Sequence, residues 1–254
     1  MINLDLFSDE YPAQPVLPFK LPDSPGFSYL WDERRNAYVI TVPNGKLVFY
    51  ETFFGKKVCD RTIEYFLENE TRIIPSYDCR DINPENIQWR NVGWQQDSIQ
   101  MYGKSILLPR LSAWYGESGM SYSYSGIMLE PNPWNKGLLY IKDKIEQTEN
   151  VLFNSVLLNW YRDGNDHISW HSDAEKELGK NPIVGSVNFG ETRRFLLRRI
   201  ENHDEKVEIS LKNGSFLIMS GELQHFWQHS VPKQKSVNGS RFNLTFRTIK
   251  NKTL

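Results

Sequence analysis

The chain has 254 residues, of which 39% are hydrophobic and 24% charged, and its formal net charge is −1. This length allows one large β-rich domain or two small ones, and the near-neutral charge excludes a global basic signature of nucleic-acid binding. Its two cysteines form no Cys-x-x-Cys pair, which argues against a disulfide or zinc site and favours a reducing compartment. Without an apolar run of about 18 residues or a secretory leader, we expect a cytoplasmic protein, nuclear if eukaryotic, with no membrane partner.

The first half of the chain predicts an arm followed by a small helical and hairpin region. Residues 1–45 show no sustained periodicity and carry five prolines between residues 12 and 25, which predicts an extended arm. Within residues 46–135, apolar side chains at helical spacing begin at Val58, and a turn over residues 101–104 predicts a hairpin. A second helix is predicted over residues 136–148, where Asn132 and its flanking prolines supply a start signal.

From residue 151 onward the pattern changes to short strands separated by turn residues. The predicted strands cover residues 153–161, 183–189, 194–199, 206–211, 215–219 and 240–248. Many short strands with regular turns predict a mainly β fold with flanking helices (α+β). We expect its sandwich or jelly-roll core over residues 136–254, joined with residues 46–135 in a single folded unit.

Candidate metal ligands occur in His171-Ser172-Asp173 and, far downstream, at His229. In a strand, residues i and i+2 face the same side, so His171 and Asp173 can aim at one point while His229 arrives from a distant strand. Two imidazoles and one carboxylate that leave three positions open are the metal-binding arrangement of non-haem Fe(II) oxygenases. An isolated His-x-Asp is a weak signal, and ordinary polar loop residues are the alternative.

The last predicted strand, Arg241–Arg247, alternates an apolar face with a polar face that carries both arginines. Burying unpaired charge costs several kcal/mol, so an anionic ligand is the simplest explanation for two arginines facing a core. Two guanidiniums can hold a dicarboxylate by paired hydrogen bonds. The alternative is a solvated strand face. Together with the metal triad, the strand predicts a 2-oxoglutarate-dependent oxygenase site.

Five stretches in order strengthen this interpretation: residues 159–166, 170–175, 186–190, 229–232 and 241–247. They resemble the AlkB family of Fe(II)/2-oxoglutarate-dependent nucleic-acid demethylases, closest to its eukaryotic-type DNA-repair branch. The resemblance implies a double-stranded β-helix (jelly roll) core and an N-terminal helix–hairpin lid for nucleotide recognition. It implies Fe(II) as cofactor, with 2-oxoglutarate and O₂ as co-substrates.

The resemblance also assigns roles to individual residues. The iron ligands correspond to His171, Asp173 and His229. The side chains that bind 2-oxoglutarate correspond to Asn159, Tyr161, Arg241, Asn243 and Arg247. Arg241 would pair with the distal carboxylate, while Asn243 and Arg247 would support the end nearer the metal. His225 lacks the Ser-Val-Pro continuation that follows His229, so we do not expect it to be a ligand.

Recognition of a flipped base is expected from a second set of residues. By resemblance these are Tyr102, Arg110, Tyr122, Tyr124 and Glu175. Tyr102 would fill the gap left by the base, with an ordinary turn aromatic as the alternative, and Glu175 would read the exocyclic amine. An aspartate is common in the family where Ala174 stands, which leaves base specificity open. Phosphate contacts could come from Lys104, Arg193, Arg194, Arg198, Arg199, Lys233 and Lys235.

The implied function is direct-reversal repair of alkylated DNA, with RNA left open. N-alkylated bases such as 1-methyladenine and 3-methylcytosine would be flipped into the site and demethylated, releasing formaldehyde and succinate. The alternatives are an RNA or protein side-chain demethylase or hydroxylase on the same fold, and a catalytically silent nucleic-acid-binding homologue. A monomer is expected by family analogy. Lesion spectrum and strand preference stay open.

Overall fold

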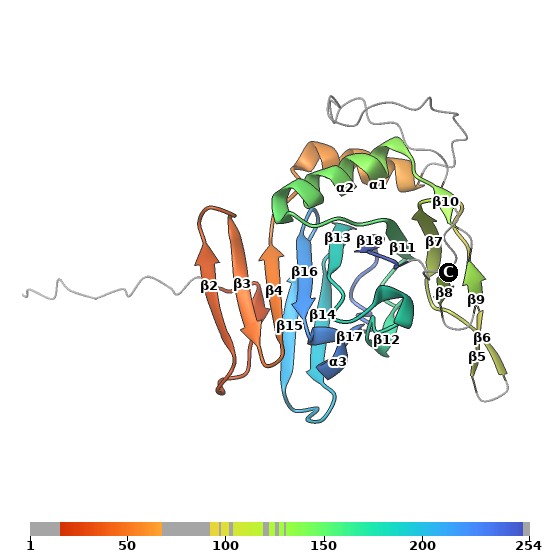
Figure 1. The fold of residues 1–254 in the computed structure, drawn as a ribbon. Helices are drawn as coiled ribbons and strands as arrows, with labels where there is room; N and C mark the ends of the chain where they lie inside the picture. The colour runs from red at the N-terminus through yellow and green to blue at the C-terminus, as the bar shows by residue number, and fades with distance from the viewer. Residues whose placement is uncertain are drawn as a thin grey trace, which may run out of the picture.

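The structure is a computed structural model that describes residues 16–67, 92–96, 98–101, 104–118, 122–124, 127–129 and 131–250. Side chains are described for these residues except 99–101, 104–105, 122–124 and 127–129. Two β-sheets dominate this part of the chain, and helices cover one of them (Figure 1). The predicted mainly β fold with flanking helices is confirmed.

The larger sheet has nine strands and is antiparallel except for the pair β10–β7. In spatial order it comprises β10 (Asn132–Pro133), β7 (Leu111–Gly116), β11 (Ser155–Tyr161), β18 (Arg241–Arg247), β13 (Val184–Gly190), β16 (Phe216–Gly221), β4 (Gly45–Tyr50), β3 (Ala37–Val42) and β2 (Ser28–Asp32). The last strand along the chain, β18, is therefore central, between β11 and β13. A charged side chain on β18 that points between the sheets is consequently far from the sheet edges.

The smaller sheet has five strands, all antiparallel to their neighbours. In spatial order it comprises β1 (Phe19–Lys20), β15 (Lys206–Leu211), β14 (Arg193–Arg199), β17 (Trp227–Val231) and β12 (Ile168–His171). Two ribbons stand apart from both sheets: β5 (Ser98–Met101) with β6 (Lys104–Leu107), and β8 (Tyr122–Tyr124) with β9 (Ile127–Leu129). Figure 1 places the ribbons and the β2–β4 strands at opposite ends of the molecule.

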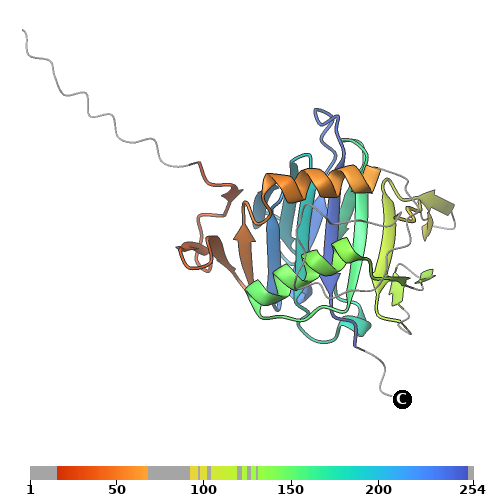
Figure 2. The same ribbon diagram turned by 90° about the horizontal axis from the view of Figure 1, so that it is seen from above.

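The helices α1 (Lys56–Leu67) and α2 (Lys136–Glu149) lie across the outer face of the nine-stranded sheet (Figure 2). Asn135 caps α2 by accepting a hydrogen bond from the Leu138 backbone N–H at 3.0 Å. Two short helical turns, α3 (Leu223–Phe226) and a 3₁₀ turn at Lys176–Leu178, complete the set among the described residues. In this part of the chain, no helix is long and apolar enough to cross a bilayer.

The two largest hydrophobic cores lie on opposite faces of the nine-stranded sheet. One lies under α1 and α2 and includes Phe242, Leu244 and Phe246 of β18. The other joins the two sheets and includes Leu47, Phe195 and other apolar side chains from both. Because neighbouring residues on a strand point to opposite faces, burying the β18 phenylalanines under the helices turns the alternate, polar residues toward the smaller sheet.

The predicted helices after residue 55 and over 136–148 are confirmed, as are the hairpin and the six predicted strands. The extended arm predicted over residues 1–45 is wrong from residue 19 onward, since β1, β2 and β3 are paired strands. Ala37, Ile40 and Val42 are buried there. Prolines suggested an arm, but they lie outside the two strands that pair across a turn. The nine-stranded sheet also runs across the predicted boundaries at residues 45 and 135.

Candidate metal and co-substrate site

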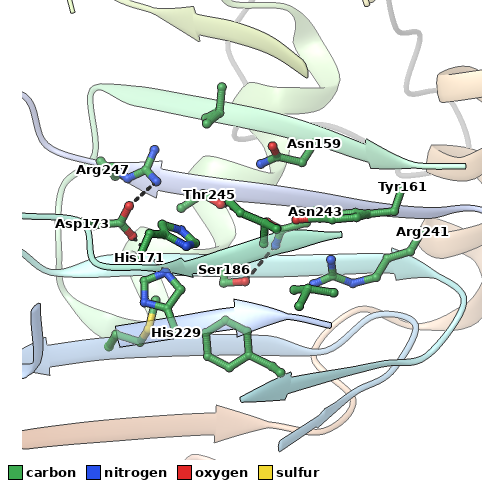
Figure 3. A pocket seen from close by; sticks show the side chains of 15 residues that line it. Asn159, Tyr161, His171, Asp173, Ser186, His229, Arg241, Asn243, Thr245 and Arg247 are labelled. Atoms are coloured by element: carbon green, nitrogen blue, oxygen red, sulfur yellow. Dashed lines mark hydrogen bonds and ion pairs between the residues drawn. The ribbon is translucent and has the colours of Figure 1, made fainter. Parts of the chain in front are cut away.

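A cavity between the two sheets collects the polar side chains of β18 and the candidate metal ligands (Figure 3). Its polar lining consists of Asn159, Tyr161, His171, Asp173, Ser186, His229, Arg241, Asn243, Thr245 and Arg247. The predicted triad lies toward one end of the row, and Arg241 lies toward the other. The alternation predicted for β18 is confirmed, because its odd-numbered residues face the cavity.

The structure brings His171, Asp173 and His229 together, with one ligand atom from each within 4.8 Å of the others. His171 is the last residue of β12, and His229 lies opposite it on β17. The two imidazole rings have centroids 4.2 Å apart. Antiparallel pairing therefore supplies two of the three groups, and Asp173 supplies the third from outside the sheet.

Asp173 reaches the site by a route different from the predicted one. We expected His171 and Asp173 to share the face of one strand, but β12 ends at His171. The Asp173 backbone N–H donates to Gln224 Oε1 at 2.9 Å, and its side-chain Oδ1 accepts from Arg247 Nη2 at 2.6 Å. Two side chains distant in the sequence thus fix Asp173, in place of strand geometry.

The electrostatics of the triad suit a divalent cation. Burial raises the pKa of Asp173, but the charge of Arg247, helped by both histidines, outweighs it and brings the pKa to about 2. Burial lowers the pKa of His229 to about 3 and also lowers that of His171. The site therefore holds one carboxylate and two neutral imidazoles, the protonation states that metal binding requires.

Two details of hydrogen bonding leave the right atoms available. His171 Nδ1 donates to the Ser169 carbonyl at 2.8 Å, which directs its Nε2 lone pair into the site. Asp173 Oδ2 is buried, lacks a hydrogen-bond partner within the described residues, and lies 3.7 Å from His229 Nε2. An unpartnered buried carboxylate oxygen between two imidazoles fits a metal such as Fe(II).

Arg241, at the other end of the cavity, is 1% exposed. Its Nη2 donates to Asn188 Oδ1, and its guanidinium carbon lies 5.0 Å from the centre of the Tyr161 ring. Across the part of the chain that is described, Nε and Nη1 of Arg241 have no hydrogen-bond partner. Burial lowers its pKa to about 10, so the side chain remains a cation. Two unpartnered donors on a buried cation fit a carboxylate ligand.

Comparison with known proteins agrees with this chemistry. The model of the 2OG-Fe(II) oxygenase superfamily matches residues 62–247. The chain belongs to this superfamily. Fe(II), with 2-oxoglutarate and O₂ as co-substrates, is the set that the superfamily implies, and the triad and Arg241 fit it.

The chain is similar to curated members that carry AlkB names. It is 44% identical over 169 residues to alkB homolog 3 of Bos taurus, covering 63% of this chain and 58% of the relative. It is 39% identical over 158 residues to the DNA oxidative demethylase ALKBH2 of Bos taurus, covering 59% and 57%. Among solved structures, OsALKBH1 aligns with 80% of this chain and 96% of its own at 16% identity and a TM-score of 0.49. The resemblance to the AlkB family is confirmed, and the chain spans less than two thirds of these curated relatives.

Between the two ends of the oxygenase cavity, amide side chains are already engaged. Asn159 Oδ1 accepts a hydrogen bond from Arg110 Nε at 2.8 Å, so the Asn159 amide oxygen is occupied and the Asn159 NH₂ group takes no part in this contact. Asn243 Nδ2 donates to Ser186 Oγ at 2.8 Å, and its Oδ1 accepts from Thr245 at 3.0 Å. Asn243 therefore braces the strands in this structure, whereas the expectation had it support the co-substrate.

Arg193 does not serve as the predicted phosphate contact, because it is fully buried. Its guanidinium donates to the backbone carbonyls of Asp163, Asp166 and Pro232 at 2.7–2.9 Å. These carbonyls belong to the two crossover loops that lead from β11 to β12 and from β17 to β18. Arg193 thus ties together the segments that connect Tyr161 with His171 and His229 with Arg241.

The two crossover loops also touch directly at Gly164. The Gly164 N–H donates to the Val237 carbonyl, and the Gly164 carbonyl accepts from the Gln234 N–H, each at 2.8 Å. A Cβ atom at Gly164 would lie 1.8 Å from the Gln234 carbonyl oxygen. Only glycine permits this approach. The two loops are therefore held in direct contact near Arg193, beside the Arg241 end of the cavity.

The residues expected to recognise a base are described only in part. Tyr102 lies outside the described residues, and so do the side chains of Tyr122 and Tyr124, whose backbone forms β8. Arg110 is buried against Asn159. Glu175 precedes the 3₁₀ turn, and its Oε2 is buried and unpartnered within the described part.

Sequence reasoning missed two residues that shape the site, Gln224 and Asn188, and gave a third, Arg193, a different role. Gln224 and Arg193 act on backbone atoms, so no pairing of charged or polar side chains in the sequence announces them. Asn188 accepts from both Arg241 and Asn243, and its place in a family-like stretch was the one available signal. His225, four residues before His229, is exposed and away from the triad, as expected.

Proposed function

We propose that this oxygenase oxidatively demethylates N-alkylated nucleobases such as 1-methyladenine and 3-methylcytosine in DNA. Each turnover would convert the N-methyl group, O₂ and 2-oxoglutarate into the free base nitrogen, formaldehyde, succinate and CO₂. The observation that carries the oxygenase chemistry is one cavity in which, among the described residues, an Asp173 oxygen at one end and two Arg241 donors at the other have no hydrogen-bond partner. The nucleobase substrate is supported by the names of the curated relatives.

The residues divide the work along the cavity. His171, Asp173 and His229 would hold Fe(II), which supplies the oxidation when bound with O₂ and 2-oxoglutarate. Arg241 would bind the distal carboxylate of 2-oxoglutarate, with Tyr161 packed against the guanidinium. Arg247 keeps Asp173 ionised and oriented. Most of the lining is buried, which lowers the local dielectric and strengthens each of these interactions.

A base within a duplex must leave the stack to reach this cavity. We propose that the two facing sheets are the jelly-roll core and that the β5–β6 and β8–β9 ribbons form the lid over the flipped base. Tyr102, Arg110, Tyr122, Tyr124 and Glu175 keep their proposed roles in contacting it. Replacing Tyr102 with Ala should impair repair of duplex more than repair of single strands, and equal losses would remove the wedge role.

The deciding experiment incubates the purified chain with Fe(II), ascorbate, 2-oxoglutarate and methylated oligonucleotides. When the methylated oligonucleotide is added, formaldehyde and succinate should both be produced. The unmethylated oligonucleotide and the His171→Ala variant are the matched controls. DNA and RNA arms, single- and double-stranded, identify the polymer. Formaldehyde from RNA alone would replace the DNA assignment, and neither product from any arm would favour a silent binding homologue. We propose a monomer that acts in the cytoplasm, or in the nucleus of a eukaryote.

A further inference from the structure

A buried glutamine contacts the backbone of one candidate metal ligand. Gln224 lies on α3 and is 1% exposed. Its Oε1 accepts the Asp173 backbone N–H at 2.9 Å. We propose that Gln224 is a positioning residue that sets the place of Asp173, and with it the affinity of the triad for metal. This inference rests on the metal site of the proposed function.

Asp173 needs such a support because it lies outside regular structure. The strand β12 ends at His171, so no ladder hydrogen bond of that strand fixes the backbone two residues later. Arg247 restrains the Asp173 carboxylate through Oδ1. The Gln224 amide restrains the Asp173 backbone, which carries this carboxylate. With both in place, the free Oδ2 oxygen has a defined direction.

The same hydrogen bond links the segment that carries His171 and Asp173 to the segment that carries His229. Gln224 is five residues before His229, and the helix α3 that holds it runs directly into β17. Asp173 lies two residues after His171 and 51 positions before Gln224 in the sequence. The bond therefore fixes the Asp173 segment relative to the His229 segment. The 3.7 Å separation of Asp173 Oδ2 and His229 Nε2 depends on that relation.

The chemistry of the side chain fits a dedicated support. Within the described residues, the other end of the amide, Nε2, contacts only the Met219 sulfur, at 3.9 Å, which is a weak acceptor. The strong interaction of Gln224 is thus the one with Asp173. An apolar side chain of the same length would fill the space and leave the buried Asp173 N–H without an acceptor.

The experiment measures Co(II) and Fe(II) affinity by anaerobic calorimetry on the full chain and on three variants, with thermal melts of the metal-free proteins. Gln224→Met keeps the length and removes the acceptor, whereas Gln224→Glu keeps an acceptor oxygen. Loss of a group that orients a metal ligand typically costs 10–100-fold in affinity. We expect Gln224→Met to bind metal about 10–100-fold more weakly and Gln224→Glu to stay within about threefold of wild type. His225→Gln, on the exposed side of α3, should match wild type.

Each outcome decides the inference. If Gln224→Met binds metal as tightly as wild type, Gln224 only fills space and the inference is overturned. If Gln224→Met fails to fold, Gln224→Asn, whose amide is one methylene shorter, replaces it under the same criterion. If wild type binds metal tightly but demethylates nothing, the proposed function fails and the positioning role still stands on the affinities. Absence of metal binding by wild type would overturn both.

Discussion

The two arginines that face the cavity from β18 have opposite surroundings. Arg247 is 6% exposed and donates to the Asp173 carboxylate at 2.6 Å. Arg241 is 1% exposed, forms no salt bridge within the described residues, and donates to the neutral amide of Asn188. Both lie on one strand, six positions apart, with similar burial. Only their partners distinguish them.

This difference shows how the cavity can orient an asymmetric ligand. Near the metal triad, the positive charge is balanced by the protein itself. At the far end, the protein leaves the positive charge of Arg241 for a ligand to balance. A dicarboxylate therefore gains most by placing one carboxylate at Arg241 and the other toward the metal. Substitutions at the two ends should therefore differ in their effects on stability and on ligand binding, and a surface ion pair provides the reference.

The largest loss of stability is expected at the metal end of the cavity, where Asp173 balances the charge of Arg247. Asp173→Ala should abolish metal binding and turnover, and should destabilise the protein by about 3–5 kcal/mol, because it leaves Arg247 as an unbalanced buried cation. Urea denaturation of the metal-free protein measures the loss. Adding Arg247→Met to Asp173→Ala should recover part of the stability, and strict additivity of the two losses would show that the pair is not coupled.

A smaller loss of stability is expected beside the far end. Arg193→Met leaves three buried carbonyls without their donor, at about 1 kcal/mol each, so the free energy of unfolding should fall by about 3 kcal/mol. Arg194→Met is the matched control, because Arg194 is the next residue on β14 and its own side chain is exposed on the outside of the five-stranded sheet. Similar melting temperatures for the two variants would contradict the loop-tying role of Arg193.

Arg241→Met should separate binding from stability. Losing charge-assisted hydrogen bonds to a carboxylate, worth about 1.5–3 kcal/mol, should raise the KM for 2-oxoglutarate about 10–100-fold. The ligand-free protein should be no less stable than wild type, since a buried cation without a carboxylate partner is removed. A destabilisation as large as that of Asp173→Ala would show that the two ends are equivalent after all.

The smallest effect is expected on the solvent side of the five-stranded sheet. The hydrogen bond from Arg194 lowers the pKa of Glu208 below its ordinary value of 4.5. The pair therefore stabilises the protein above pH 4.5, and the contribution is lost as pH falls through the lowered pKa. Because Arg194 is half-exposed, the Arg194→Ala/Glu208→Gln double-mutant cycle should give below about 1 kcal/mol at pH 7. A coupling comparable to that of Asp173 and Arg247 would be inconsistent with solvent screening.

The alternation of β18 was predictable from sequence because phenylalanine and arginine require opposite environments. The gathering of His171, Asp173 and His229 was predictable as chemistry, whereas the bond that places Asp173 was not. Gln224 and Arg193 bind backbone atoms, whose positions exist only after folding. The pairing of β2 with β3 was missed because nearby prolines outweighed the β-forming residues around Tyr38. The base-facing tyrosines stay a prediction.

The closed loops at Gly164 have a kinetic consequence. They hold two loops tightly together beside the Arg241 end, and of the three candidate ligands only His171 is partly exposed. Under the proposed function, we expect 2-oxoglutarate to enter from the His171 side and to pass the three candidate ligands on its way to Arg241. A nucleic acid lying over that side would cover the same passage. If the substrate is the proposed nucleic acid, we expect a compulsory order, with co-substrate loading first and succinate departing only after the nucleic acid has left.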